Sequence, residues 1–184
     1  MKKQFLSFFY AFRGIWDAVC TETHLRFHLT AAFYVLLLSP FFELNAAQYG
    51  VLILLIAAVI SAELFNTSLE TVCDLITKER SYYIRIAKDI SAAAVLVFAL
   101  AATAVAVVFF WNAAAFAAMF KFFAANPILP AALVLSAVNA VFFVALGPRE
   151  IWDRLNQDTT CLAQLLDIWL YHTKAVDTST KYVE

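Results

Sequence analysis

Four polar side chains recur at helical spacing directly behind a long apolar stretch of the sequence. The apolar stretch covers residues 44–62, and the polar residues follow as Glu63, Asn66, Glu70 and Asp74. At 100° per residue, these four side chains point within a stripe about 80° wide. Because a charged side chain costs about 2.5–3.5 kcal/mol near the centre of a membrane span, the stripe cannot simply face lipid. It must face other helices, water or a cation.

The residue types in this stripe suit phosphate chemistry assisted by a metal ion. Converging carboxylates are hard oxygen ligands of the kind that Mg²⁺ takes, and Mg²⁺ usually brings phosphate with it. A partly desolvated glutamate such as Glu63 could also act as a general base. The plainer interpretation is a solvated helix end that emerges from the membrane near Glu70.

Further polar residues approach the same membrane face. Glu22 ends an amphipathic amino-terminal segment just before Arg26 and the first apolar stretch, whereas Lys88 and Asp89 stand at the mouth of the third. Taken alone, Lys88 would be an ordinary basic anchor at a membrane boundary. Its convergence with the acidic residues favours a functional site.

The composition indicates that the bilayer is the solvent of this chain. Of its 184 residues, 64% are hydrophobic and 15% are charged, which is more apolar surface than a soluble domain of this length could bury. The stretches without a charged residue are 27–42, 44–62, 90–120 and 122–148. Since a transmembrane helix needs about 20 apolar residues, we predict four spans, with the third near residues 90–110.

The predicted fold is that of an all-α polytopic membrane protein. The amphipathic segment before the first span predicts a helix lying on the membrane surface. The apolar spacing of the tail predicts a second amphipathic helix, which we expect to begin after an N-cap at Asp158. With four spans, every Lys and Arg except Lys121 falls on one side, so the positive-inside rule places both termini and residues 76–88 in the cytoplasm.

Several site classes are disfavoured by missing motifs. The sequence has no GxxxxGK[ST] and no GxGxxG, so side chains and metal would have to hold any nucleotide. His24 and His28 have a zinc-like spacing but no evident third ligand. The cysteines Cys20, Cys73 and Cys161 are far apart and form no CxxC pair, which favours neither a disulfide framework nor a structural zinc site. The net charge of −1 says nothing by itself about partners, and no nucleic-acid partner is expected.

The segments "YAFRGI", "ELFNTSLETVCD" and "AKDISAAAVL", together with Glu22 and Arg26, resemble the bacterial diacylglycerol kinase and undecaprenol kinase family of small integral-membrane lipid kinases. The family hallmark E-x-x-N-[ST]-x-[IL]-E-x-x-x-D begins here at Glu63. The resemblance covers about residues 4–110 and implies a three-span kinase core within residues 1–110. Residues 111–184 match no family element, so a regulatory or partner-binding role and a plain surface helix both stay open for the tail.

The resemblance also implies roles for individual residues. Glu63 would take the proton from a lipid hydroxyl as it attacks the γ-phosphate of ATP, and Lys88 would neutralise phosphate charge. Glu22 and Glu70 would hold Mg²⁺. The nucleotide-binding residues implied by the resemblance are Glu22, Asn66, Glu70, Asp74, Lys88 and Asp89. Such a set can support phosphoryl transfer without a P-loop, because this reaction demands mainly positioning and charge neutralisation.

Substrate, cofactors and assembly follow from the same resemblance. It implies ATP and Mg²⁺ as cofactors, a homotrimer with shared active sites, and a place in the bacterial inner (cytoplasmic) membrane with the site on the cytoplasmic side. Arg26 and His28 fall in the substrate region, and their R-x-H arrangement is similar to the undecaprenol branch, which favours a polyprenol over diacylglycerol. Two other classes stay open: a small cation transporter or channel, and a non-catalytic membrane scaffold. The gathering of acids at one face disfavours the first, and the intact motifs disfavour the second.

Overall fold

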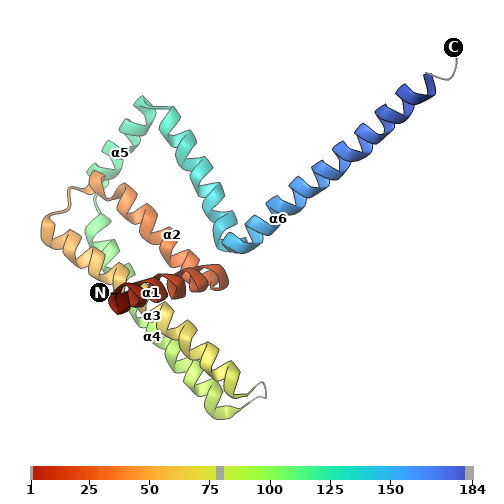
Figure 1. The fold of residues 1–184 in the computed structure, drawn as a ribbon. Coiled ribbons are helices and arrows are strands. Elements are labelled where there is room, and N and C mark those ends of the chain that lie inside the picture. The colour runs from red at the N-terminus through yellow and green to blue at the C-terminus, as the bar shows by residue number, and fades with distance from the viewer. Residues whose placement is uncertain (1, 78–80, 181–184) are drawn as a thin grey trace. The chain divides into compact units, whose positions relative to one another are not determined.

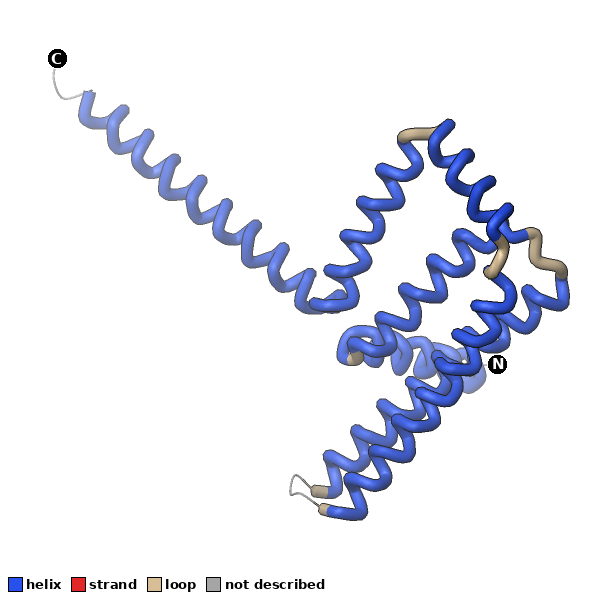
Figure 2. Tube along the Cα trace, turned by 180° about the vertical axis from the view of Figure 1, so that it is seen from behind, coloured by secondary structure: helices blue, strands red, loops and turns tan. Residues whose placement is uncertain are grey.

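The computed structural model describes residues 2–77 and 81–180, with side chains for residues 4–77 and 81–156. Every regular element in these residues is a helix (Figure 2). In chain order the elements are α1 (Lys2–Thr21), α2 (Thr23–Leu38), the short 3₁₀ helix η1 (Ser39–Phe42), α3 (Ala46–Ile76), α4 (Tyr82–Phe110), α5 (Ala113–Ala125) and α6 (Ile128–Thr180) (Figure 1). The prediction of an all-α fold is confirmed.

Four segments are long and apolar enough to cross a membrane. They are Thr23–Phe42, Ala46–Ile76, Tyr82–Phe110 and Ile128–Asn156. The predicted polytopic membrane protein with four spans is therefore confirmed. The 13-residue helix α5 is too short for a crossing and joins the third span to the fourth.

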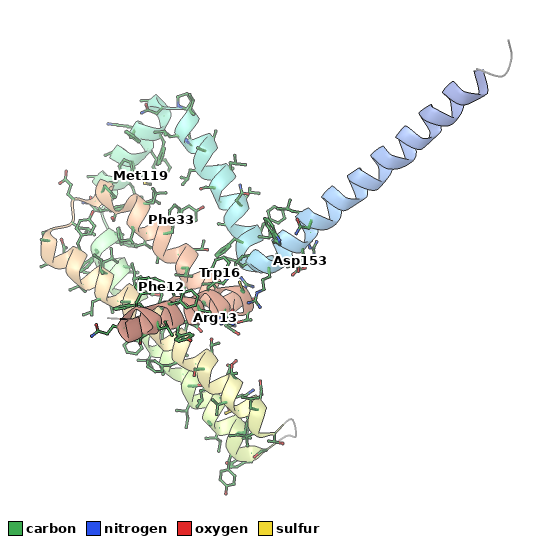
Figure 3. All side chains as sticks on the ribbon, in the orientation of Figure 1. Phe12, Arg13, Trp16, Phe33, Met119 and Asp153 are labelled. Carbon is green, nitrogen blue, oxygen red and sulfur yellow. The ribbon has the colours of Figure 1, made fainter. Side chains whose placement is uncertain are left out.

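Helix α1 presents large aromatic side chains on its surface. Figure 3 labels two of them, Phe12 and Trp16, whose side chains are 70% and 57% exposed. On the same helix, Nε of Arg13 lies 3.9 Å from Oδ2 of Asp17. This mixture of exposed aromatic and charged groups suits a helix at a membrane boundary. The helix ends before Glu22, whose extended backbone (φ −99°, ψ 113°) separates α1 from α2.

Helix α3 positions the polar stripe and begins at a well-formed cap. The Asn45 side chain accepts a hydrogen bond from the Gln48 N–H, and the Gln48 side chain accepts one from the Asn45 N–H. Its 31 residues make a helix of roughly 46 Å, whereas the hydrocarbon layer is about 30 Å thick. One end of α3 therefore extends beyond the apolar layer. Helix α4 packs along α3 and forms the most extensive helix–helix contact among the described elements (Figures 1 and 2).

Helix α6 contains a sharp break at Gly147, which has φ +76° and ψ 163°. Glycine adopts a positive φ without the steric penalty of a side chain, and Pro148 is suited to the first position of a new helix. Helical backbone consequently resumes at Pro148 and runs through residue 158. The expected N-cap at Asp158 is wrong, because the Gly-Pro pair begins this helix ten residues earlier.

Residues Met1–Gly147 and Pro148–Glu184 form two separate compact units. The first unit contains α1 to α5 and the part of α6 up to the break, and hence all the residues of the candidate site. The predicted division separates a kinase core at 1–110 from an extension at 111–184, whereas the two compact units are separated by their internal contacts. The predicted division stays a prediction.

Candidate active site

The first residue of the polar stripe, Glu63, lies on the buried face of α3. Its side chain is only 6% exposed, and its Oε1 lies 3.2 Å from Nε2 of His28 on α2. A buried carboxylate without a partner would be costly, so the imidazole accounts for its position. The pair brings a potential base and a histidine together between two helices.

The next part of the stripe faces α4. The Asn66 amide donates a 3.0 Å hydrogen bond to Glu70 Oε1, and the Ser91 hydroxyl donates one of 2.6 Å to Asn66 Oδ1. Ser91 also lies 2.9 Å from the carbonyl of Lys88. The amide nitrogen of Asn66 is bonded to Glu70 of α3 and its oxygen to Ser91 of α4. These two bonds fix the orientation of the amide, which in turn orients Glu70.

The last part of the stripe forms an ion pair with the third predicted span. Lys88 Nζ lies 2.5 Å from Asp74 Oδ1, and the Asp74 side chain is 68% exposed. Asp89 points elsewhere, since its carboxylate lies 3.9 Å from Arg85 and both side chains are 66% exposed. The structure thus joins Lys88 to the stripe and places Asp89 on the surface of α4.

Glu22 and Arg26 lie at the junction of α1 and α2. Glu22 is half-buried, and within the described residues no hydrogen bond or ion pair links its side chain to the α3–α4 network. Arg26 is 3% exposed and donates to the backbone carbonyls of Val19, Cys20 and Val144. The guanidinium of Arg26 is thus bonded to the protein's own backbone. Its predicted place in the substrate region stays a prediction.

An apolar groove of about 320 Å³ runs between α2, α3 and α4. Its walls come from residues 27–35 of α2, 52–60 of α3 and 99–106 of α4, most of them aliphatic or alanine. His28 is one of the lining residues, so the Glu63 carboxylate that it contacts lies beside the groove. An apolar channel with a polar group at its side suits a ligand with a hydrocarbon chain and a polar head.

The residues present are compatible in their chemistry with Mg²⁺ and phosphate. No group of three His, Cys, Asp or Glu side chains is assembled in the described part of the chain. Mg²⁺, however, is usually held by one or two carboxylates together with substrate phosphates and water. Glu70 offers such a carboxylate, oriented by Asn66. The adjacent Thr67 hydroxyl is buried and has no hydrogen-bond partner, which leaves a polar atom for a ligand to satisfy.

Ser91 is not among the site residues predicted from the sequence, although its spacing from Lys88 indicates a place in the site. Ser91 follows Lys88 by three residues, so both fall on the same face of α4. A short hydroxyl at that position can reach a neighbouring helix. The pairing of His28 with Glu63, by contrast, depends on how α2 packs on α3 and has no local signal in the sequence.

The site thus combines a buried carboxylate beside an apolar groove with an Asn66–Glu70 pair on α3 and an ion pair between Asp74 of α3 and Lys88 of α4. This arrangement in a helical membrane protein is compatible with an enzyme that acts on a lipid. Residues 9–110, more than half of the chain, match the prokaryotic diacylglycerol kinase family, and the chain belongs to this family. It is therefore a lipid kinase, and the predicted family and enzyme class are confirmed.

Two relatives illustrate the range of the family. The chain is 40% identical over 100 residues to a protein named undecaprenol kinase from Bacillus subtilis, covering 54% of this chain and 81% of that protein. It is 39% identical over 102 residues to a protein named diacylglycerol kinase from Synechocystis sp., covering 54% of this chain and 58% of that protein. The family match ends at residue 110, so α5 and α6 lie outside it.

Proposed function

We propose that this kinase transfers the γ-phosphoryl group of ATP to the hydroxyl of a membrane polyprenol such as undecaprenol. The observation that carries the proposal is the Glu63–His28 pair beside the apolar groove. A lipid alcohol whose chain occupies the groove would present its hydroxyl to Glu63. The family assignment supports the use of ATP and of a lipid acceptor.

In the proposed reaction Glu63 acts as the general base. The lipid oxygen forms a bond to the γ-phosphorus as its proton passes to a Glu63 carboxylate oxygen, and the bond to ADP breaks. His28, in contact with the other side of this carboxylate group, holds it in place. Lys88, supported by Asp74, supplies positive charge on the phosphate side, and Asn66 with Ser91 fixes Glu70.

We further propose that Glu70 and Glu22 bind Mg²⁺, which when bound neutralises charge on the phosphates. Glu22 has no bond to the α3–α4 network within the described residues of one chain. This supports a site shared between copies in a homotrimer, since a neighbouring subunit could then supply the second carboxylate. Light scattering of the solubilised protein measures the number of copies, and a monomer active as a kinase would contradict the shared site.

A transfer assay with ³²P-labelled ATP tests the proposed function. The purified protein in lipid is offered undecaprenol, a short prenol and diacylglycerol, each with and without Mg²⁺. We expect labelled undecaprenyl phosphate as the main product and loss of transfer without the metal. Labelled phosphatidic acid as the main product would instead favour diacylglycerol, which the Synechocystis relative's name makes the second candidate.

Substitution of Glu63 tests the proposed base. Glu63→Gln keeps the shape of the side chain but cannot accept the proton, so we expect a fall in kcat of about 10²–10⁴-fold. Glu43→Gln is the matched control, because Glu43 is an exposed glutamate outside the stripe. If Glu63→Gln keeps near wild-type transfer, Glu63 is not the base.

A further inference from the structure

The guanidinium of Arg26 joins three separate parts of the chain. Its Nη1 donates hydrogen bonds of 3.0 and 3.3 Å to the carbonyls of Val19 and Cys20, at the end of α1. Its Nε donates one of 3.1 Å to the carbonyl of Val144 in α6, and its Nη2 donates one of 3.0 Å to the Thr23 hydroxyl. A planar guanidinium with donors on several sides can make this set of bonds, whereas the single ammonium of a lysine cannot reproduce it.

Each of these carbonyls lacks its ordinary helical donor. Val19 and Cys20 lie in the last turn of α1, where backbone carbonyls have no N–H ahead of them in the helix. The Val144 carbonyl would normally accept from the residue four positions on, but this residue is Pro148, which has no N–H. Arg26 therefore satisfies buried or partly buried acceptors at the end of α1 and just before the break in α6.

Gly147 allows this arrangement. An added Cβ at Gly147 would lie 2.9 Å from Nη1 and 3.0 Å from Cζ of Arg26, and 3.3 Å from the carbonyl oxygen of Cys20. Its φ of +76° is also a conformation that side chains with a Cβ rarely adopt. The backbone at the break in α6 can thus approach the guanidinium only with a glycine at this position.

The bonds of Arg26 lie on both sides of Glu22. Glu22 is the single non-helical residue between α1 and α2, with its N–H bonded to the Ala18 carbonyl and its own carbonyl bonded to the Arg26 N–H. Arg26 bridges this break, because it lies on the first turn of α2 and bonds to carbonyls in the last turn of α1.

We propose that Arg26 is a positioning residue that holds Glu22 in place for Mg·ATP, and that the backbone at the break in α6, at Val144 and Gly147, holds Arg26. The inference rests on the proposed role of Glu22 in binding Mg·ATP. It gives a part of the chain beyond the family match a role in the kinase reaction, since Val144 and Gly147 follow residue 110. The fourth span acts through Arg26 and does not itself touch the substrates.

The test uses the full-length protein in lipid and two variants, Gly147→Ala and Arg26→Lys. Isothermal calorimetry measures the dissociation constant of Mg·ATP, and steady-state kinetics measure KM for Mg·ATP and for the lipid. Because loss of a residue that orients a ligand typically costs about 10–100-fold, we expect an increase of that order in both Mg·ATP constants. Because the guanidinium is bonded to the protein's own backbone, we expect an unchanged lipid KM, contrary to the predicted place of Arg26 in the substrate region. A merely structural role would lower the amount of folded enzyme and leave these constants at wild-type values.

Gly50→Ala is the matched control, because Gly50 lies within α3 and an added Cβ there meets nothing within 4 Å. This control should bind Mg·ATP as the wild type does. If Gly147→Ala yields no folded protein, Arg26→Lys decides the question by itself. Folded Arg26→Lys protein with wild-type Mg·ATP constants would overturn the inference.

A Glu22→Gln background separates the inference from the proposed function. If Glu22→Gln weakens Mg·ATP binding and Arg26→Lys adds nothing further in that background, the two residues act as one unit. If Arg26→Lys weakens binding equally in both backgrounds, it acts elsewhere and the inference is overturned. If Glu22→Gln alone leaves Mg·ATP binding unchanged, the proposed role of Glu22 fails, and the positioning role of Arg26 fails with it.

Discussion

At the scale of single residues, the site consists of polar groups that hold one another. Asn66 lies between Glu70 on its own helix and Ser91 on α4, and Ser91 is tied back to the Lys88 carbonyl. An amide with both ends bonded keeps one orientation, so the Glu70 carboxylate also keeps one direction. A carboxylate held in one direction would suit the proposed role of Glu70 in binding Mg²⁺.

Removal of the Ser91 hydroxyl should therefore affect the reaction more than the fold. Ser91→Ala frees Asn66 to rotate, and since one such hydrogen bond contributes about 1 kcal/mol, we expect kcat/KM for Mg·ATP to fall about fivefold. The ³²P assay at varied Mg·ATP measures this. Ser61→Ala, an exposed serine on α3, is the control and should leave kcat/KM unchanged. Equal values for both variants would show that Ser91 does not orient the site.

At the scale of elements, α2, α3 and α4 together form a surface that none of them has alone. The groove between them is lined largely by aliphatic and alanine side chains, and the small residues of α4 leave its space open. All three helices that line it are candidate membrane spans. A long isoprenoid chain could lie in such a groove while its head remains at the polar stripe.

Filling the groove should weaken the binding of long lipids and leave nucleotide binding intact. Ala102 lines the groove, and Ala102→Phe would place a ring in it. Because overpacking typically costs about 1–3 kcal/mol, we expect the KM for undecaprenol to rise roughly tenfold, with an unchanged KM for Mg·ATP. The neighbouring Ala101 is exposed on the same helix, so Ala101→Phe is the control. A similar effect of both substitutions would argue against the groove as the lipid site.

At the scale of the whole molecule, the lengths of the apolar helices and the positions of the Lys and Arg residues indicate how the chain is placed in the membrane. Four candidate spans return the chain to its starting side, and every basic residue except Lys121 then falls on that side. On the positive-inside rule we propose that this side is the cytoplasm, where ATP would be available to the polar stripe, and that the protein lies in the inner membrane.

Cysteine labelling tests the orientation. In a background in which Cys20, Cys73 and Cys161 are replaced by serine, Lys121→Cys and Lys2→Cys each introduce one thiol. A membrane-impermeant maleimide added to intact cells from which the outer barrier is removed should label only Lys121→Cys. Lys2→Cys should react only after the membrane is opened. The reverse pattern would place the polar stripe on the outer side, away from ATP.

Much of this protein was determined by the sequence alone, because the signals are local. The length of each apolar stretch sets the spans, and the helical spacing of Glu63, Asn66, Glu70 and Asp74 puts them on one stripe. The Gly147-Pro148 pair is local as well and overrides the expected cap at Asp158. These features depend on neighbours in the chain and on the solvent, so they can be predicted without the fold.

Only the tertiary structure decided which partner each polar group has. His28 meets Glu63 because α2 packs on α3, and Ser91 reaches Asn66 because α4 lies along α3. Arg26 bonds to the carbonyl of Val144, which is 118 positions away in the sequence. A buried polar group takes whichever partner the packing of distant segments brings within about 3 Å, and this choice is not encoded by residue spacing.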